Sequence, residues 1–240
     1  MQYSNIEWRG FQGVEFAFEG CTAKLIKPNV PPNGKWLLKT EYFDAFPETE
    51  IELLNRGWHL AYNKNKNRWA EDYDLERKAH FVEFVVKEFG LNEKCVPVGM
   101  SCGGLYAVKL ATLIPERIEK LYLDAPVMNF LSCPFGLGIK DDTTVTGEEY
   151  TRLTGRTLSE MLSYREHPID KMPILLQNKI PIVLVSGDSD RVVPYIENGA
   201  LLEKYYKENG GDITVFIKEG GDHHPHGIEN VTVLADAIGK

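Results

Sequence analysis

The chain has 240 residues, of which 43% are hydrophobic, and its formal net charge is −8. This length suffices for one large α/β domain (residues 1–240) with a substantial core. The acidic balance argues against a nucleic-acid partner or an anionic membrane partner. No apolar run reaches the roughly 18 residues needed to span a bilayer, and the first ten residues lack the pattern of a secretory signal. We therefore expect a cytoplasmic protein.

Cysteine usage supports the same compartment. The four cysteines, at positions 21, 95, 102 and 133, are widely spaced and show no paired metal-type spacing. We expect them to be free thiols in a reducing environment, without a zinc site or a disulfide framework.

The first half of the chain is predicted to alternate between strands and helices. Val14, Phe16 and Phe18 fall on one face of an alternating run, which is typical of a strand. The apolar residues of 73–90 recur with spacing 4-3-4-3, which is typical of an amphipathic helix. The expected elements are a hairpin at 14–28, a turn at 31–34, a buried strand at 35–39, a helix at 48–56, a strand at 58–62, a polar loop at 63–72 and a helix at 73–90.

The second half continues this alternation, with one interruption. The expected elements are a strand at 95–98, a tight turn, a helix at 105–114, strands at 118–126 and 180–185, a helix at 197–208, a strand at 213–218 and a helix at 231–238. Such alternation predicts an α/β fold with a mostly parallel sheet and helices on both faces. Residues 127–179, with a helical run at 148–164, are expected to form a small cap over one end of the sheet; a longer crossover packed on the sheet face is the alternative.

The turn at residues 99–103 reads Gly-Met-Ser-Cys-Gly and carries the first candidate for chemistry. A serine on a sharp strand-to-helix turn is held in a strained conformation, and only small neighbours let the two backbones pass closely. The turn places the hydroxyl at a helix N-terminus, where developing negative charge is favoured. Ser101 is therefore the candidate nucleophile, and an incidental serine in a glycine-rich turn is the alternative.

A carboxylate follows a later strand, in the segment Gly187–Pro194. The carboxyl ends of parallel strands share one sheet edge, so Asp190 should lie near the Ser101 turn. Asp188, two residues away, is a competitor better suited to capping the turn. Asp124, at the end of an earlier strand, is a second competitor.

Three histidines lie on a glycine-flanked loop after the last strand, at positions 223, 224 and 226. An imidazole must take the proton of a serine nucleophile, and a carboxylate must orient the imidazole. His223, the first after the glycines, is the favoured base, and His224 and His226 are candidates for shaping the pocket. Metal ligation is not expected, because no carboxylate at ligand spacing accompanies the cluster.

A tetrahedral intermediate also needs backbone N–H donors for its oxyanion. One donor should be the N–H of Cys102, directly after the candidate nucleophile. The other should come from the loop after the strand at 35–39, from Glu41 or Tyr42.

These motifs together resemble the α/β-hydrolase fold family over nearly the whole chain. The shared marks are Gly-x-Ser-x-Gly, the Gly-x-x-Asp-x-x-Val-Pro pattern at 187–194 and the histidine loop; segments such as MSCGGLYA and LYLDAPVMNF are similar to a bacterial subgroup of α/β-hydrolases and esterases. The resemblance implies Ser101, Asp190 and His223 as a catalytic triad. One departure is Thr40-Glu41-Tyr42, which stands where the family usually has His-Gly, and it leaves the second oxyanion donor open.

The expected function is a serine hydrolase that cleaves a small-molecule carboxylic ester through an acyl-enzyme, with no cofactor or metal. The alternatives are a peptidase or acylaminoacyl hydrolase with the same residues, and a non-catalytic binding protein on the same scaffold. Candidates for substrate contact are Phe43, Trp69 and His224. The sequence leaves the oligomeric state and the acyl and alcohol specificity open.

Overall fold

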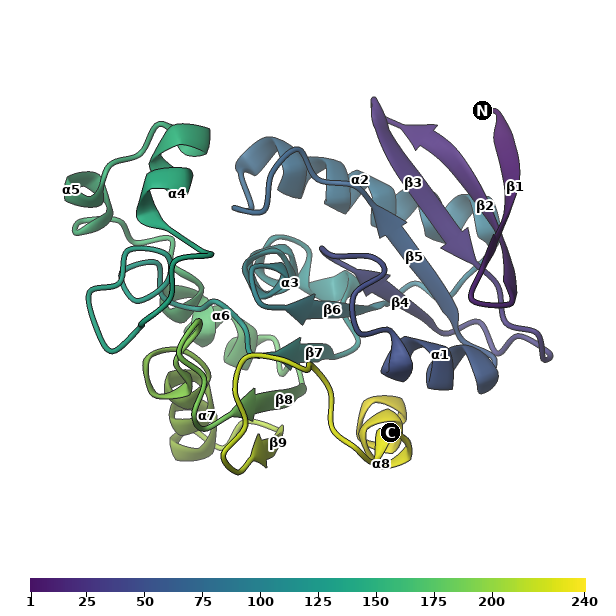
Figure 1. Cartoon of the computed structure of the whole chain (residues 1–240). Helices are drawn as coiled ribbons and strands as arrows, with labels where there is room; N and C mark the ends of the chain where they lie inside the picture. Colours follow the sequence, from purple (N-terminus) through teal and green to yellow (C-terminus); the bar gives the residue numbers. More distant parts are fainter.

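A single nine-stranded sheet forms the centre of the molecule (Figure 1). The computed structural model describes residues 1–240. The strand order is β1-β2-β3-β5-β4-β6-β7-β8-β9, with antiparallel pairing from β1 to β5 and parallel pairing from β5 to β9. The strands are β1 (Tyr3–Trp8), β2 (Phe11–Phe18), β3 (Cys21–Ile26), β4 (Trp36–Lys39), β5 (His59–Asn63), β6 (Val96–Met100), β7 (Leu121–Asp124), β8 (Ile182–Gly187) and β9 (Ile213–Lys218).

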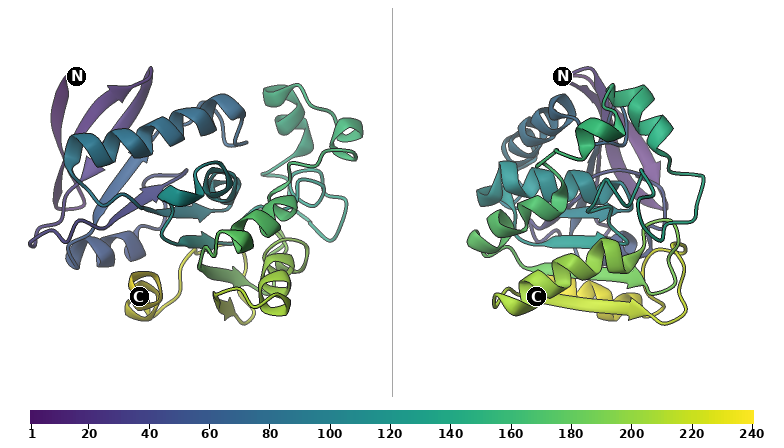
Figure 2. Two further views of the ribbon diagram at one scale, coloured as in Figure 1. Left: turned by 180° about the vertical axis from the view of Figure 1, so that it is seen from behind. Right: turned by 90° about the vertical axis from the view of Figure 1, so that its left-hand side faces the viewer.

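Helices cover both faces of the sheet, which confirms the predicted fold class. Helices α1 and α8 pack on one face, and α2, α3, α6 and α7 cover the other, so that two buried apolar clusters lie on either side of the sheet (Figures 1 and 2). The helices are α1 (Glu48–Asn55), α2 (Asp72–Phe89), α3 (Gly103–Leu113), α4 (Gly147–Thr154), α5 (Leu158–Met161), α6 (Met172–Gln177), α7 (Gly199–Glu208) and α8 (Val231–Gly239). No helix is both long enough and apolar enough to cross a membrane.

The predicted hairpin is present as β2 and β3, which turn at Glu19 and Gly20 with positive φ angles of 44° and 79°. Such φ angles match the two-residue turns that suit the twist of hairpin strands. The structure adds β1, which the sequence analysis did not predict. It pairs with β2 and places the ring of Tyr3 against Phe16 and Phe89.

Two further differences lie in the second half of the chain. The helical run predicted at 148–164 is broken, because Gly155 takes a left-handed conformation (φ 75°) and ends α4. A left-handed glycine is a common helix stop. The structure also contains α6, which was not predicted; its Leu175 is fully buried in the larger core cluster.

The segment between β7 and β8 rises beyond the sheet edge as α4, α5 and their loops, here called the cap (residues 129–168; at the left in Figure 1). Hydrogen bonds close its base: Ile169 N–H donates to Met128 O at 3.1 Å, and Phe130 N–H donates to Nδ1 of His167 at 3.1 Å. These bonds hold the two ends of the cap side by side.

Two ion pairs join the cap to the loop that precedes α2. Arg68 pairs with Glu149 of α4, and Nη1 of Arg156 lies 2.6 Å from Oε1 of Glu71.

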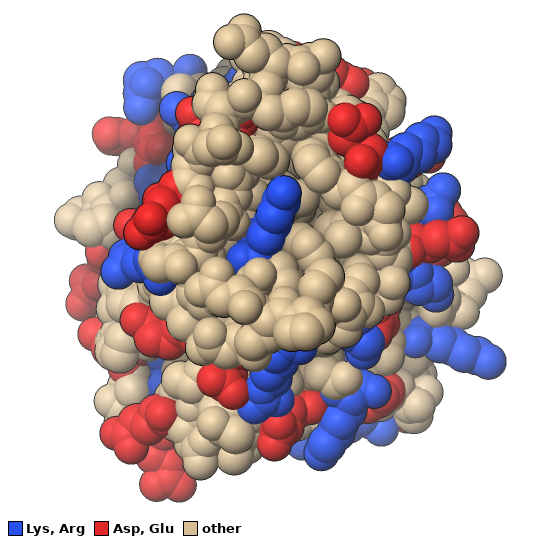
Figure 3. All heavy atoms as spheres, turned by 90° about the vertical axis from the view of Figure 1, so that its right-hand side faces the viewer, with Lys and Arg blue, Asp and Glu red and all other residues tan.

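The face of the molecule around β1 to β3 is shown in Figure 3. Acidic and basic side chains are interspersed on this face around largely uncharged surface.

Candidate active site

Ser101 lies between β6 and α3 with a left-handed φ of 51°. For a residue with a side chain this conformation is strained, and neighbouring structure must hold it in place. Three backbone bonds do so: Ser101 N–H donates to Asp124 O at 3.0 Å, and its carbonyl accepts from Gly104 N–H at 2.9 Å and Val127 N–H at 3.0 Å. The end of β7 therefore braces the turn that carries the serine.

The glycines at this turn are required by close approach. A Cβ on Gly99 would lie 2.8 Å from the Cβ of Ala107 and 2.9 Å from the Cα of Gly104. A Cβ on Gly104 would lie 2.8 Å from the Cα of Pro126. Since Cβ atoms do not approach backbone this closely, larger residues here would push α3 off the sheet.

His223 and Asp190 complete a continuous hydrogen-bonded chain with Ser101. Nε2 of His223 lies 3.1 Å from Oγ of Ser101, and its Nδ1 lies 2.7 Å from Oδ2 of Asp190. The other oxygen of Asp190 accepts from the N–H groups of Val192 and Val193, both at 2.8 Å. The carboxylate is therefore oriented by its own turn, and all three side chains are buried.

The two competing acids occupy other positions. Asp188 is exposed, and Oδ1 accepts from Gly220 N–H at 2.8 Å, so it joins the acid loop to the histidine loop. Asp124 is fully buried; Oδ1 lies 2.7 Å from Nδ1 of His226, and Oδ2 accepts from Gly227 N–H at 2.6 Å. A second histidine–carboxylate pair, which the sequence analysis did not predict, thus lies beside the first.

The three imidazoles of the histidine loop lie together. The ring of His223 has its centroid 4.7 Å from that of His224 and 5.0 Å from that of His226. His224 is exposed at the loop surface, and burial of its inner edge together with the neighbouring imidazoles lowers its pKa. One nitrogen from each ring lies within 4.8 Å of the other two, so these residues are the group that could hold a metal ion.

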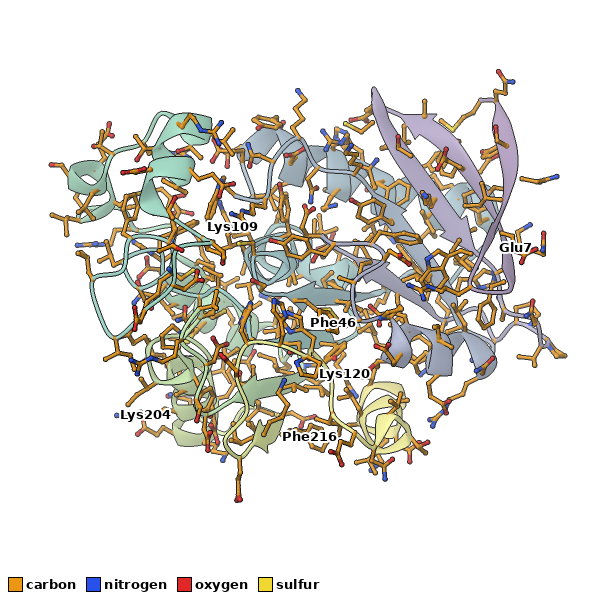
Figure 4. All side chains as sticks on the ribbon, in the orientation of Figure 1. Glu7, Phe46, Lys109, Lys120, Lys204 and Phe216 are labelled. Atoms are coloured by element: carbon orange, nitrogen blue, oxygen red, sulfur yellow. The ribbon has the colours of Figure 1, made fainter.

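Phe46, labelled in Figure 4, packs against the histidine loop. Its ring stacks on His224 with centroids 5.2 Å apart and planes inclined by 14°, and it meets His226 edge-on at the same distance. The sequence analysis did not single out Phe46. It lies in the same loop as Phe43, so no signal in the pattern separated the two aromatic residues.

The end of β4 runs alongside the serine turn. The hydroxyl of Thr40 lies 2.8 Å from the carbonyls of both Val98 and Gly103, which ties β4 to β6 and α3. The N–H groups of Cys102, Glu41 and Tyr42, the candidates for the two expected oxyanion donors, donate to no backbone oxygen. These three N–H groups therefore remain candidates to donate hydrogen bonds to a negatively charged oxygen of a substrate.

Of the residues that carry these N–H groups, Cys102 is buried, and Glu41 and Tyr42 are partly buried. Burial raises the pKa of the Cys102 thiol to about 11, which keeps it protonated and unreactive near neutral pH. Burial also raises the pKa of Glu41, whose carboxylate accepts a hydrogen bond from the amide of Asn65. Tyr42 has a left-handed φ of 53°.

Part of the polar loop at 63–72 is buried and hydrogen-bonds to its surroundings. Asn65 is 6% exposed and donates to the carbonyl of Thr40 at 2.8 Å, and Asn63 is 0% exposed and accepts from Arg77 at 2.9 Å. Trp69, expected to contact substrate or solvent, is 1% exposed and meets Tyr150 of the cap edge-on. The tryptophan therefore packs the cap onto the main body.

Phe43, also expected to contact substrate, is turned toward the N-terminal strands. Its ring packs against Trp8 and Tyr62, with centroids 5.2 Å and 5.1 Å away, and the ammonium of Lys24 lies over it. Of the three candidates for substrate contact, only His224 thus lies beside His223.

Little of Ser101 is exposed to solvent. The serine is 5% exposed. A hollow of about 1,020 Å³ lies within the cap and another of about 1,120 Å³ lies between Phe46 and β9, and neither is lined by Ser101.

No protein-family model matches the chain. Solved structures resemble it at low identity. Est1E from Butyrivibrio proteoclasticus has 16% identity and a TM-score of 0.62, with 98% of this chain and 95% of that one covered. The α/β-hydrolase enzyme MGS-MChE2, from a lagoon-sediment metagenome, has 15% identity and a TM-score of 0.57, with 94% and 95% covered.

A third similar structure belongs to a longer protein. The acylaminoacyl peptidase of Pyrococcus horikoshii has 15% identity and a TM-score of 0.63, with 89% of this chain covered. The chain spans 38% of that protein's length, so the match concerns one part of it. Together these likenesses show that the chain has the α/β-hydrolase fold, as the sequence motifs predicted.

Proposed function

We propose that this α/β-hydrolase-fold protein is a serine hydrolase that cleaves small carboxylic esters through an acyl-enzyme. The observation that carries the proposal is the unbroken chain from Oγ of Ser101 to Nε2 of His223 (3.1 Å) and from its Nδ1 to Asp190 (2.7 Å). A serine hydroxyl is a weak nucleophile until a positioned imidazole takes its proton.

The geometry supports a specific order of proton transfers. The carboxylate of Asp190 accepts a hydrogen bond from Nδ1–H of His223 and stays ionised, which leaves the Nε2 lone pair facing the serine hydroxyl. Ser101 attacks the acyl carbon while His223 takes its proton; His223 then returns that proton to the leaving alkoxide, and the alcohol departs. Water repeats the sequence on the acyl-enzyme and releases the acid.

The negative charge of each tetrahedral intermediate needs fixed donors. The N–H of Cys102 lies at the start of α3, where the helix dipole also favours an anion. The second donor in this proposal is an N–H of the loop after β4, from Glu41 or Tyr42. One such donor contributes about 3–4 kcal/mol to transition-state stability.

A second candidate is a peptidase or acylaminoacyl hydrolase that uses the same side chains. The likeness to the Pyrococcus horikoshii acylaminoacyl peptidase favours it, although the chain spans only 38% of that protein. A non-catalytic binding protein would not need the buried chain of hydrogen bonds.

Fluorophosphonate labelling combined with a substrate screen tests the proposal. We expect wild-type protein to be labelled on Ser101 and to hydrolyse p-nitrophenyl esters faster than aminoacyl nitroanilides. Ser101→Ala should abolish both labelling and turnover, and Ser4→Ala, at an exposed serine of β1, is the matched control. A folded Ser101→Ala variant with unchanged ester turnover would exclude the proposed mechanism, and faster nitroanilide cleavage would favour the peptidase.

A further inference from the structure

We infer that the histidine loop is a zinc-binding site, formed by His223, His224 and His226, and that bound zinc inhibits the hydrolase. One nitrogen from each ring lies within 4.8 Å of the other two. Three imidazoles with an open fourth position are a common ligand set for zinc. The inhibition rests on the proposed function, whereas the binding does not.

The nitrogens that face the metal follow from the hydrogen bonds already described. Nδ1 of His223 is bonded to Asp190, and Nδ1 of His226 is bonded to Asp124, each at 2.7 Å. In both rings Nδ1 therefore carries the proton, and Nε2 keeps the lone pair that a metal needs.

The two carboxylates are the outer partners that zinc-binding histidines require. A metal-ligating imidazole almost always donates its other N–H to a carboxylate, carbonyl or water, which fixes the ring and raises its basicity. The side chains of Asp190 and Asp124 are 1% and 0% exposed, so both pairs are held firmly within the protein. The sequence showed no carboxylate at ligand spacing; the fold instead brings two carboxylates behind the rings.

His224, the third ligand, is exposed, so it can change its position and is open to a metal ion from solvent. In tetrahedral geometry with Zn–N bonds of about 2.0–2.1 Å, ligand nitrogens lie about 3.3 Å apart. The loop must therefore contract slightly, and exposed His224 can turn toward the two anchored rings without disturbing the core. Because His224 also opens to solvent, a metal ion can reach the cluster from outside.

Inhibition follows from competition for one lone pair. Nε2 of His223 accepts the proton of Ser101 in the proposed reaction, with 3.1 Å between the two atoms. A zinc ion bound to that nitrogen prevents the transfer, so ester turnover should stop and chelation should restore it. No bond in the protein is made or broken beyond the three metal–nitrogen bonds.

Direct binding is measured on the full chain after treatment with a chelator. Calorimetric titration with ZnCl₂ alone is expected to give one ion per chain, and Co²⁺ is expected to give the visible absorption of a tetrahedral site. His224→Gln should weaken zinc binding by about 100-fold, and Asp124→Asn by about 10–100-fold through loss of the outer carboxylate. His80→Gln is the control, because His80 is an exposed histidine on α2.

A wild-type protein that binds no zinc, or a His224→Gln variant that binds it as tightly as wild type, would overturn the site. Fluorophosphonate labelling with and without zinc is then compared in wild type and His224→Gln. Zinc should block labelling in wild type at concentrations at which His224→Gln keeps the labelling rate that this variant shows without zinc; wild-type labelling unaffected by saturating zinc would overturn the inhibition. Zinc binding in a protein that is never labelled would refute the proposed function and leave the metal site standing.

Discussion

Replacing Asp190 by asparagine probes the orientation of the proposed base. The turn amides of Val192 and Val193 both donate to Oδ1 of Asp190, at 2.8 Å. An asparagine can keep these bonds only with its carbonyl oxygen in that place, which turns its NH₂ group toward His223. Nδ1 of the imidazole must then accept a proton instead of donating one, and Nε2 carries an N–H toward Ser101.

The expected loss is large because the wrong tautomer cannot take the serine proton. An amide in this position of a serine triad lowers kcat by about 10⁴-fold, equivalent to about 5 kcal/mol at 1.36 kcal/mol per tenfold. The fold should survive, since the two turn bonds remain. Steady-state hydrolysis of p-nitrophenyl acetate measures kcat, and circular dichroism with thermal melting checks the fold.

Asp188→Asn is the matched control, two residues away on the same loop and exposed to solvent. It should keep kcat near the wild-type value, because its carboxylate contacts Gly220 and Ser189 and no reacting group. A folded Asp190→Asn variant with kcat within tenfold of wild type would refute the reasoning. If Asp190→Asn stayed active while Asp124→Asn lost activity, the acid would have to be reassigned to Asp124 at the end of β7.

Three other measurements test the surroundings of the site. Thr40→Val removes a buried hydroxyl that lies at hydrogen-bond distance from two carbonyls, so the free energy of unfolding should fall by about 1–3 kcal/mol in urea titrations; Thr40→Ser should lose less, and equal stability of the valine variant would contradict the role. Lys39→Met leaves the carboxylate of Glu50 buried without its partner, so the free energy of unfolding should fall by about 3–5 kcal/mol. The double variant Lys39→Met/Glu50→Leu should recover most of this loss, and a double variant no more stable than Lys39→Met would argue against the reasoning. The low exposure of Ser101, 5%, predicts that kcat/KM falls from acetyl to palmitoyl esters of one alcohol, and rates that rise with chain length would indicate a lipase-like enzyme.

Most of the sheet could be predicted because its signals are local. Glycines at 90 and 20 mark a helix stop and a hairpin turn, and strands with alternating or wholly apolar residues reveal whether one face or both are buried. β1 escaped prediction because its burial is incomplete, with three of its six residues exposed. α6 escaped because six residues are too few to show a helical period.

The site was predictable where chemistry and topology agree. Ser101, Asp190 and His223 each follow a strand at the carboxyl edge of the sheet, so their meeting could be expected from strand order alone. The pair of Asp124 and His226 could not be predicted in this way. Both residues lie at the same edge as the others, and only the path of the loop decides which carboxylate meets which imidazole. Trp69 was misplaced because a polar loop is usually solvated, whereas here Asn63 accepts a hydrogen bond from Arg77 and Asn65 donates one to the carbonyl of Thr40 inside the protein.

The closed base of the cap affects which insertions and deletions the protein can tolerate during evolution. Met128 and Ile169 are hydrogen-bonded, and Phe130 and His167 are joined just above them, so everything between is a loop whose ends are already fixed. Doubling the length of such a loop costs only about 0.6 kcal/mol of closure entropy. Insertions and deletions above this base can therefore accumulate while the strands below keep their register.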